Sequence, residues 1–394
     1  MTIPYLIRVI GVDNFGLLAF VTAIIMQFKI ITDYGFDLSA TRQISENRSD
    51  LKKINEVYSS VLIVKIALTL FCFVFLLLLS FFNILGKDSD IYILTFGMVV
   101  GYSLFPVWLF QGMEDMRHIA YINIFAKTIF TICIFIYVQE KEDYWMVPLF
   151  NSAGLLFAGV WSLKIANKKF QTKFKMQSFG KIVEQIKSGW HVFISRLYVN
   201  LYTTANIIIL GLLSTNEVVG YYSVSEKILF AISGLFLPIM QGYYPYLVKI
   251  YSISKEAFFK KIDQLINFSI LASIILTVLA LIFSNEIIFI VSGGSNQEMI
   301  EVFMILALSI VSSPFGALFT RGLLVLKRDA IVSSVIKSTL ILNTIIVFPL
   351  IFYFEAKGLA AAWVVGRIFH AVLYYVKFNI IAKGIISKMN FKKT

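Results

Sequence analysis

Long apolar stretches follow one another along almost the whole chain, and the polar loops between them are short. Hydrophobic residues make up 58% of the 394 residues and charged residues 15%, whereas about 25% of a soluble domain is charged. Because roughly 20 apolar residues in an α-helix span the hydrocarbon core of a bilayer, the chain is predicted to be an all-α polytopic membrane protein.

Eleven stretches have the length of transmembrane helices. They are residues 15–38, 57–82, 91–112, 117–138, 144–166, 189–212, 217–247, 264–292, 299–325, 330–354 and 358–382. The basic segment 167–188 is predicted to be a cytoplasmic linker between an N-terminal lobe of five helices (1–166) and a C-terminal lobe of six (189–394). The N-terminal residues lack the basic region and cleavage site of a signal peptide, so the spans themselves are expected to direct insertion.

Lysine and arginine residues are distributed unequally between alternate loops. One set of loops, together with the C-terminal tail, holds 23 of them, and the opposite set holds 4. Because cytoplasmic loops are enriched in Lys and Arg, the C-terminus is expected to lie in the cytoplasm. The net charge of +12 has the same origin, so no nucleic-acid partner is expected.

Eight further cations lie inside the predicted spans, where a charge is costly and usually serves a function. They are Lys29, Lys65, Lys127, Arg196, Lys227, Arg321, Lys337 and Arg367. The acids in these spans are Glu226 and, near a span end, Asp33. The excess of cations predicts a water-filled path or pocket for an anionic ligand, although the i,i+4 spacing also allows Lys29 and Asp33 simply to pair.

Two spans have features that bear on such a pocket. Arg367 and His370 share one helix face at i,i+3 spacing. The segment 312–316 contains Ser, Pro and Gly and interrupts the ninth span before Arg321. The interruption indicates either a kink beside a cavity or tight helix packing through small residues.

Several other functional classes lack support in the sequence. Cys72 and Cys133 lie in apolar spans and are interpreted as small hydrophobic residues, and the three His residues are too scattered to form a metal site. There is no phosphate-binding P-loop for an ATP-driven pump. The longest internal loop has a single acid, Glu184, which argues against a glycosyltransferase or polymerase. Neither enzymatic activity nor a cofactor is expected.

Four strings, spread in order along the chain, resemble the O-antigen flippases of polysaccharide biosynthesis (the Wzx type). These belong to the multidrug/oligosaccharidyl-lipid/polysaccharide exporter superfamily. The strings are Ile3-Pro4-Tyr5-Leu6-Ile7-Arg8-Val9-Ile10-Gly11 with Phe15-Gly16, Asp33-Tyr34-Gly35-Phe36-Asp37-Leu38-Ser39-Ala40-Thr41-Arg42, Pro106-Val107-Trp108-Leu109-Phe110-Gln111-Gly112-Met113-Glu114, and Val219-Gly220-Tyr221-Tyr222. Relative to the family, the chain is expected to lack most of the first helix.

The resemblance implies twelve family helices in two pseudo-symmetric lobes around a central cavity. It further implies a protein of the bacterial cytoplasmic (inner) membrane that flips undecaprenyl-diphosphate-linked oligosaccharide by alternating access, driven by an ion gradient. Membrane lipids, an O-antigen polymerase and a chain-length regulator are the other partners it suggests. Two alternatives in the same superfamily remain open, namely a multidrug cation exporter and a peptidoglycan-precursor flippase; the excess of embedded cations favours an anionic cargo.

On this basis eight of the embedded charges have an expected role. The residues expected to bind the diphosphate or acidic sugars are Arg196, Lys227, Arg321, Arg367, Lys29 and Lys127. Guanidinium groups suit this role because they match phosphate oxygens in a bidentate manner. The ion-coupling candidates are Glu226, which is the leading one, and Asp33.

Overall fold

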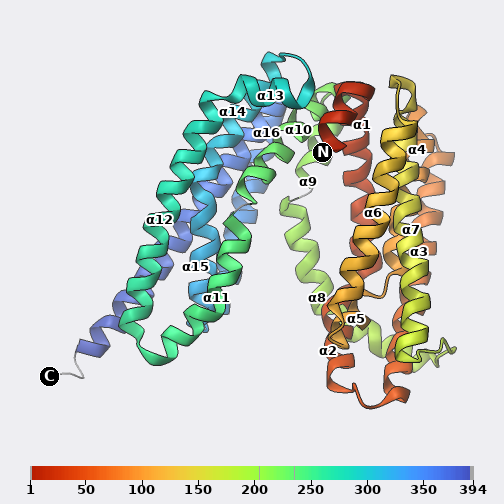
Figure 1. Ribbon diagram of the computed structural model, residues 1–394, viewed down its shortest axis with the longest axis horizontal. Coiled ribbons are helices and arrows are strands. Elements are labelled where there is room, and N and C mark those ends of the chain that lie inside the picture. Colours follow the sequence, from red (N-terminus) through yellow and green to blue (C-terminus); the bar gives the residue numbers. More distant parts are fainter. Residues whose placement is uncertain (1, 204, 235, 391–394) are drawn as a thin grey trace. The chain divides into compact units, whose positions relative to one another are not determined.

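The computed structural model describes residues 2–203, 205–234 and 236–390 (Figure 1). Within these residues the regular elements are helices, and there is no strand. Contacts divide the chain into two compact units, Met1–Ile208 and Ile209–Thr394. The predicted lobes, residues 1–166 and 189–394, have different limits from these two contact units and stay a prediction.

Unit 1 contains eight helices before the unit boundary. They are α1 (Thr2–Asp33), α2 (Phe36–Glu46), α3 (Leu51–Phe81), α4 (Ser89–Leu104), α5 (Val107–Gly112), α6 (Met116–Tyr137), α7 (Met146–Phe170) and α8 (Phe179–Thr203), with α9 (Ala205–Leu213) at the boundary. The short 3₁₀ turns Gly86–Asp88 and Lys141–Trp145 precede α4 and α7. Helix α4 packs along α7, and buried aromatic residues such as Trp108 and Phe110 fill the interior beside them.

Unit 2 combines several shorter helices with one long, bent helix, α16. They are α10 (Asn216–Ser233), α11 (Phe236–Ile253), α12 (Lys255–Ile282), α13 (Ser284–Ser292), α14 (Gln297–Ala307), α15 (Ser313–Val325) and α16 (Asp329–Asn390). Helix α16 turns back on itself at Glu355, whose φ and ψ are 47° and −124°. Its two halves pack on α15, and the core there is centred on Phe319, Tyr374 and Phe378.

The polytopic all-α prediction is confirmed, and the predicted spans fall on these helices. Eight helical segments in the described part of the chain are long and apolar enough to cross a membrane. The number is below eleven partly because α16 holds two predicted spans, 330–354 and 358–382, joined at the Glu355 bend. The spans 189–212 and 217–247 fall on α8 to α11, which are interrupted. Large apolar side chains on α3, α6, α12 and the first half of α16 are exposed, as expected of a lipid-facing surface.

Ion pairs join three of the loops predicted to be cytoplasmic at one end of unit 1. Arg48, after α2, pairs with Glu114, before α6, at 2.7 Å. Lys169, at the end of α7, pairs with Asp115 at 2.7 Å. Burial by itself raises the pKa of Asp115, but the hydrogen bonds and charges of Lys169 and His118 outweigh it and hold that pKa below its usual value. The loops of the basic set therefore meet at one end of this unit.

The turn between α1 and α2 brings α8 close to the rest of unit 1. Tyr34 and Gly35 have φ values of 46° and 75°, which end α1 and suit glycine at the second position. A Cβ on Gly35 would lie 2.7 Å from Val192 of α8, and one on Gly189 would lie 2.8 Å from the Tyr34 carbonyl oxygen. The two glycines therefore allow the backbones of the turn and α8 to touch.

Candidate functional site

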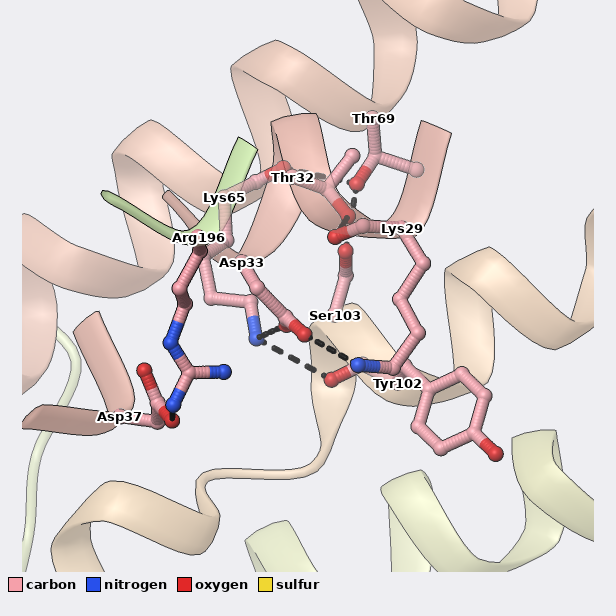
Figure 2. Close-up of polar contacts among 9 residues, drawn as sticks. All are labelled: Lys29, Thr32, Asp33, Asp37, Lys65, Thr69, Tyr102, Ser103 and Arg196. Atoms are coloured by element: carbon pink, nitrogen blue, oxygen red, sulfur yellow. Dashed lines mark hydrogen bonds and ion pairs between the residues drawn. The ribbon is translucent and has the colours of Figure 1, made fainter. Parts of the chain in front are cut away.

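Three embedded charges of unit 1, Lys29, Asp33 and Lys65, form a cluster between α1, α3 and α4 (Figure 2). Asp33 Oδ2 lies 2.5 Å from Lys29 Nζ, and Asp33 Oδ1 lies 2.9 Å from Lys65 Nζ. Lys65 is only 3% exposed, and it also donates to the Tyr102 carbonyl oxygen at 3.2 Å. A charge this deeply buried is stable only when it is paired, so Asp33 compensates Lys65.

The neighbours of this cluster extend its polar contacts. Lys29 Nζ lies 4.9 Å from the centre of the Tyr102 ring, in the arrangement of a cation–π contact. Thr69 Oγ1 lies 2.6 Å from Ser103 Oγ and donates to the Lys65 carbonyl oxygen. The i,i+4 pairing of Lys29 with Asp33 is confirmed, and Lys65 is a second partner that chain spacing alone did not reveal.

Arg196 is also ion-paired. Its guanidinium group extends from α8 to the carboxylate of Asp37 in the first turn of α2, as Figure 2 shows. The side chain of Arg196 is 44% exposed, so solvent reaches the guanidinium group despite the pair. Near the same contact, the rings of Tyr34 and Phe193 stack with centroids 4.8 Å apart. Together these contacts hold α8 against the turn between α1 and α2.

Lys127 lies in a separate small cavity of unit 1. The cavity has a volume of about 130 Å³ and lies between α4, α6 and α7. Asn123, Thr131 and Asn151 supply its other polar side chains, and Tyr102 contributes to the wall. Tyr102 therefore connects the wall of this cavity to the Lys29–Asp33–Lys65 cluster.

Unit 2 contains a larger cavity, of about 660 Å³, which brings two predicted site residues together. Arg321 reaches it from α15, and Arg367 reaches it from the second half of α16. His370 also lines the cavity, which confirms that it shares a face with Arg367. Phe230 and Ser233 complete one wall from α10. We call this space, lined by Arg321, Arg367 and His370, the arginine cavity.

Both arginines of the arginine cavity contact neighbouring groups of unit 2. Arg367 Nη2 lies 3.5 Å from Ser313 Oγ, and its guanidinium carbon lies 5.8 Å from the centre of the Trp363 ring. Arg321 Nη1 donates to the carbonyl oxygen of Ala317 in its own helix. Arg321 has no carboxylate partner among the described residues. The cavity therefore has two guanidinium groups in its lining, and guanidinium groups form charge-assisted hydrogen bonds with anions.

Trp363 is a cavity residue that the sequence did not single out. Its side chain is buried in the cavity wall, and its indole N–H has no hydrogen-bond acceptor among the described residues. A buried donor without an acceptor is costly, so the indole N–H is available to a ligand in the cavity. The aromatic ring also gives the cavity a flat apolar surface beside the guanidinium group. The i,i+4 spacing to Arg367 was the available signal, but the abundance of aromatic residues concealed it.

A break in the helix borders the arginine cavity. The segment Leu308–Ser312 is a 3₁₀ helix between α14 and α15, and Pro314 lies in the first turn of α15. Proline has no N–H to continue the α-helical ladder, so the interruption occurs where the sequence predicted it. Gly316 follows, and a Cβ there would lie 3.5 Å from the His370 ring. The break therefore lies beside a cavity, and the packing through Gly316 is close.

The remaining candidates have different surroundings. Glu226 lies in α10 and is 8% exposed. It interacts with the charge of Lys227 and forms a hydrogen bond with the Tyr222 side chain. Phe230, one helical turn further, lines the arginine cavity. Lys337 is exposed near the start of α16, as expected of a long side chain that reaches the headgroups. In the described residues no group of three or more His, Cys, Asp or Glu side chains could hold a metal ion.

Solved structures of membrane transporters share this fold. An inward-facing multidrug resistance MATE family transporter of the MOP superfamily has a TM-score of 0.73 at 14% identity, covering 98% of both chains. Lipid II flippase MurJ, in an inward closed conformation, has a TM-score of 0.75 at 12% identity, covering 99% of this chain and 89% of that chain. At such low identity the likeness shows the fold alone.

Two relatives are named "Putative O-antigen transporter". The chain is 30% identical to the one from Escherichia coli (strain K12) over 246 residues, which cover 62% of this chain but only 59% of that protein. It is 26% identical to the one from Shigella dysenteriae over 368 residues, covering 91% of this chain and 90% of that protein. A family described as polysaccharide biosynthesis protein matches residues 1–251. The resemblance carried by the sequence strings is thus confirmed: this multi-pass membrane chain belongs to the polysaccharide biosynthesis protein family.

Proposed function

We propose that this protein transports a lipid-linked oligosaccharide, carried on undecaprenyl diphosphate, across the bacterial cytoplasmic membrane. The observation that carries the proposal is the arginine cavity, a space of about 660 Å³ that the side chains of Arg321 and Arg367 both line. Family membership and the names of the two relatives support a polysaccharide cargo. The proposed orientation, with a cytoplasmic C-terminus, is supported by the distribution of Lys and Arg among the loops.

The charge of the cavity suits the part of the cargo that is most costly to move. A diphosphate is anionic, and its transfer through hydrocarbon is opposed by a large desolvation penalty. Guanidinium groups replace lost hydration with charge-assisted hydrogen bonds, often in pairs. In our proposal Arg367 and Arg321 bind the diphosphate, and Trp363, with its flat ring and its indole N–H, contacts the adjoining sugar.

The other embedded cations, which do not line the arginine cavity, have separate proposed roles. Lys127 lines its own cavity and is proposed to bind acidic or phosphorylated groups there. Lys29 and Arg196 are partly exposed but already paired with carboxylates, so an anionic cargo would have to displace those carboxylates. Lys227, beside Glu226, is proposed to contribute positive charge near the cavity. Alternating access would move these groups between the two sides of the membrane.

Ion coupling is assigned to Glu226. A carboxyl group buried in a membrane helix is a common site of proton or cation binding, and Glu226 lies one turn before a cavity-lining residue. Asp33 is the weaker candidate because two ammonium groups within 3 Å already neutralise it. Binding of an ion at Glu226 would change the charge beside the cavity and so the affinity for the cargo.

Deleting the gene in its host tests the proposal as a whole. We expect loss of surface polysaccharide together with accumulation of the lipid-linked oligosaccharide on the cytoplasmic leaflet, and the full chain supplied from a plasmid should reverse both. Normal surface polysaccharide with hypersensitivity to cationic drugs would contradict the proposal and identify a multidrug exporter instead. Accumulation of a peptidoglycan precursor with cell lysis would also contradict it and identify a precursor flippase.

The variant Glu226→Gln tests the coupling assignment. Glutamine keeps the size of the side chain but cannot exchange a proton. We therefore expect transport into vesicles to lose its response to an imposed ion gradient. For each 1.4 kcal/mol of driving force lost, accumulation of the cargo should fall about tenfold. The measurement is uptake of a fluorescent lipid-linked oligosaccharide with and without the gradient. Glu217→Gln, an exposed position in the same helix, is the control. A full gradient response in Glu226→Gln would remove this residue from the mechanism.

A further inference from the structure

Residues 171–178, which connect α7 to α8, are held in place although they are not helical, and Phe179 follows them as the first residue of α8. The backbone of this connection forms hydrogen bonds with side chains of α3. The Lys173 N–H donates to Asn55 Oδ1 at 2.7 Å, and the Lys175 N–H donates to Ser59 Oγ at 3.0 Å. Ser59 in turn donates to the Lys173 carbonyl oxygen at 3.3 Å. We call this the α7–α8 segment, and it is the yellow-green loop after α7 in Figure 1.

The fixed backbone presents apolar side chains outward. Phe174 is 52% exposed, Met176 is 81% exposed and Phe179 is 80% exposed, whereas Thr172 is buried. Three large apolar side chains in six residues would be unfavourable in water, because each leaves apolar area unburied. Exposed patches of this kind usually mark an interaction surface.

The charge of the segment is uniformly positive. From Lys164 to Lys181 there are six lysines and no acid. Lys169 and Lys181 pair with Asp115 and Glu56 on neighbouring helices. The exposed lysines Lys168, Lys173 and Lys175 have no ion pair among the described residues. The partner that fits therefore carries negative charge next to apolar material.

Depth in the membrane identifies that partner. Apart from Leu51 in the first turn, the large apolar side chains exposed on α3 begin at Ile66. Ser59, which binds the segment, lies seven residues before Ile66. At 1.5 Å per residue this is about 10 Å, close to the depth of the headgroup layer outside the hydrocarbon core. At that depth an anionic phospholipid offers phosphate to the lysines and the start of its acyl chains to the aromatic rings.

We propose that the α7–α8 segment is a docking site for anionic phospholipids. Lys173 and Lys175 bind headgroup phosphates, and Phe174, Met176 and Phe179 enter the boundary between headgroups and acyl chains. Because Asn55 and Ser59 fix the backbone, the lipid contact anchors the start of α3 and the start of α8 at the same membrane surface. This contact does not depend on which cargo the protein moves.

A spin label at Met176→Cys tests the proposal in the full-length protein, with Cys72 and Cys133 replaced by Ser. The protein is reconstituted in vesicles of phosphatidylcholine and phosphatidylglycerol and, separately, of phosphatidylcholine alone. The measurement is the collision rate of the label with oxygen and with a water-soluble nickel chelate. A second protein adds Lys173→Gln and Lys175→Gln, and a label at Ser295→Cys, an exposed loop position, shows the accessibility of a solvated site.

We expect the label at 176 to be shielded from the nickel chelate in the phosphatidylglycerol vesicles and more accessible in phosphatidylcholine alone. Each lysine near an anionic surface contributes a factor of about five, so the double glutamine variant should shift the equilibrium about 25-fold toward the solvated segment. Accessibility equal to that of the label at 295 in both kinds of vesicle would overturn the proposal. Equal shielding in both kinds of vesicle and in the glutamine variant would overturn it too, because the contact would then not need the anionic lipid.

Discussion

Replacing Arg367 by glutamine is expected to reduce export of the lipid-linked oligosaccharide by about 10- to 100-fold. A hydrogen bond to a charged group contributes about 1.5–3 kcal/mol, and every 1.4 kcal/mol corresponds to about a tenfold change. Arg367 lines the arginine cavity beside Ser313 and Trp363, so its replacement is expected to weaken cargo binding. The measurement is surface polysaccharide in a deletion strain, at equal levels of membrane-inserted protein.

Three further variants make this result specific. Arg367→Lys keeps the charge but loses the two-pronged geometry of the guanidinium, so an intermediate output is expected. Lys377→Gln removes an exposed cation from the same half of α16, outside the arginine cavity, and should leave output unchanged. Arg321→Gln should behave like Arg367→Gln. Normal output from both arginine variants and from their combination would show that the cavity does not bind the cargo.

The variant Asp33→Asn is expected to destabilise unit 1 by about 3–5 kcal/mol, the usual cost of leaving a buried charge without its partner. The reason is Lys65, which would remain buried beside Lys29 with no carboxylate between them. For a unit of roughly 200 residues this corresponds to a fall in Tm of about 6–20 °C. Thermal unfolding of the purified protein in detergent, followed by tryptophan fluorescence, measures it.

Replacing both members of the buried pair separates the two roles that Asp33 could have. Asp33→Asn combined with Lys65→Met removes the uncompensated charge, so much of the lost stability should return. Asp13→Asn, an exposed position in the same helix, should leave Tm unchanged. A stable Asp33→Asn protein that has lost its response to an ion gradient would instead favour Asp33 as a coupling group.

The helical spans could be predicted from the sequence because their signal is local. An apolar run of sufficient length needs no partner to be recognised, and the break near Pro314 followed from the missing N–H. Neighbours along one helix were predictable for the same reason, as with Asp33 beside Lys29 and His370 beside Arg367. These relations depend only on the period of the α-helix.

Contacts between distant helices could not be read from the sequence. Lys65 lies 32 positions from Asp33, and their pairing depends on how α1 and α3 pack. Arg321 and Arg367 meet in one cavity because α15 packs against the second half of α16, and Arg196 binds Asp37 across 159 positions. An embedded cation looks the same in a sequence whether it lines a cavity, as Lys127 does, or forms an ion pair, as Lys29 does.

The walls of the arginine cavity have a consequence for how cargo preference can diverge. The wall from α15 contains Gly316, Ala317 and Thr320, all small, whereas the groups that we propose to bind the anion are on Arg321 and Arg367. A methyl group at position 316 would meet the His370 ring at 3.5 Å, an ordinary van der Waals contact. In the proposed function, substitutions at the small positions would therefore reshape the space for sugars while both guanidinium groups remain. Related strains could then acquire new surface antigens with the same exporter fold.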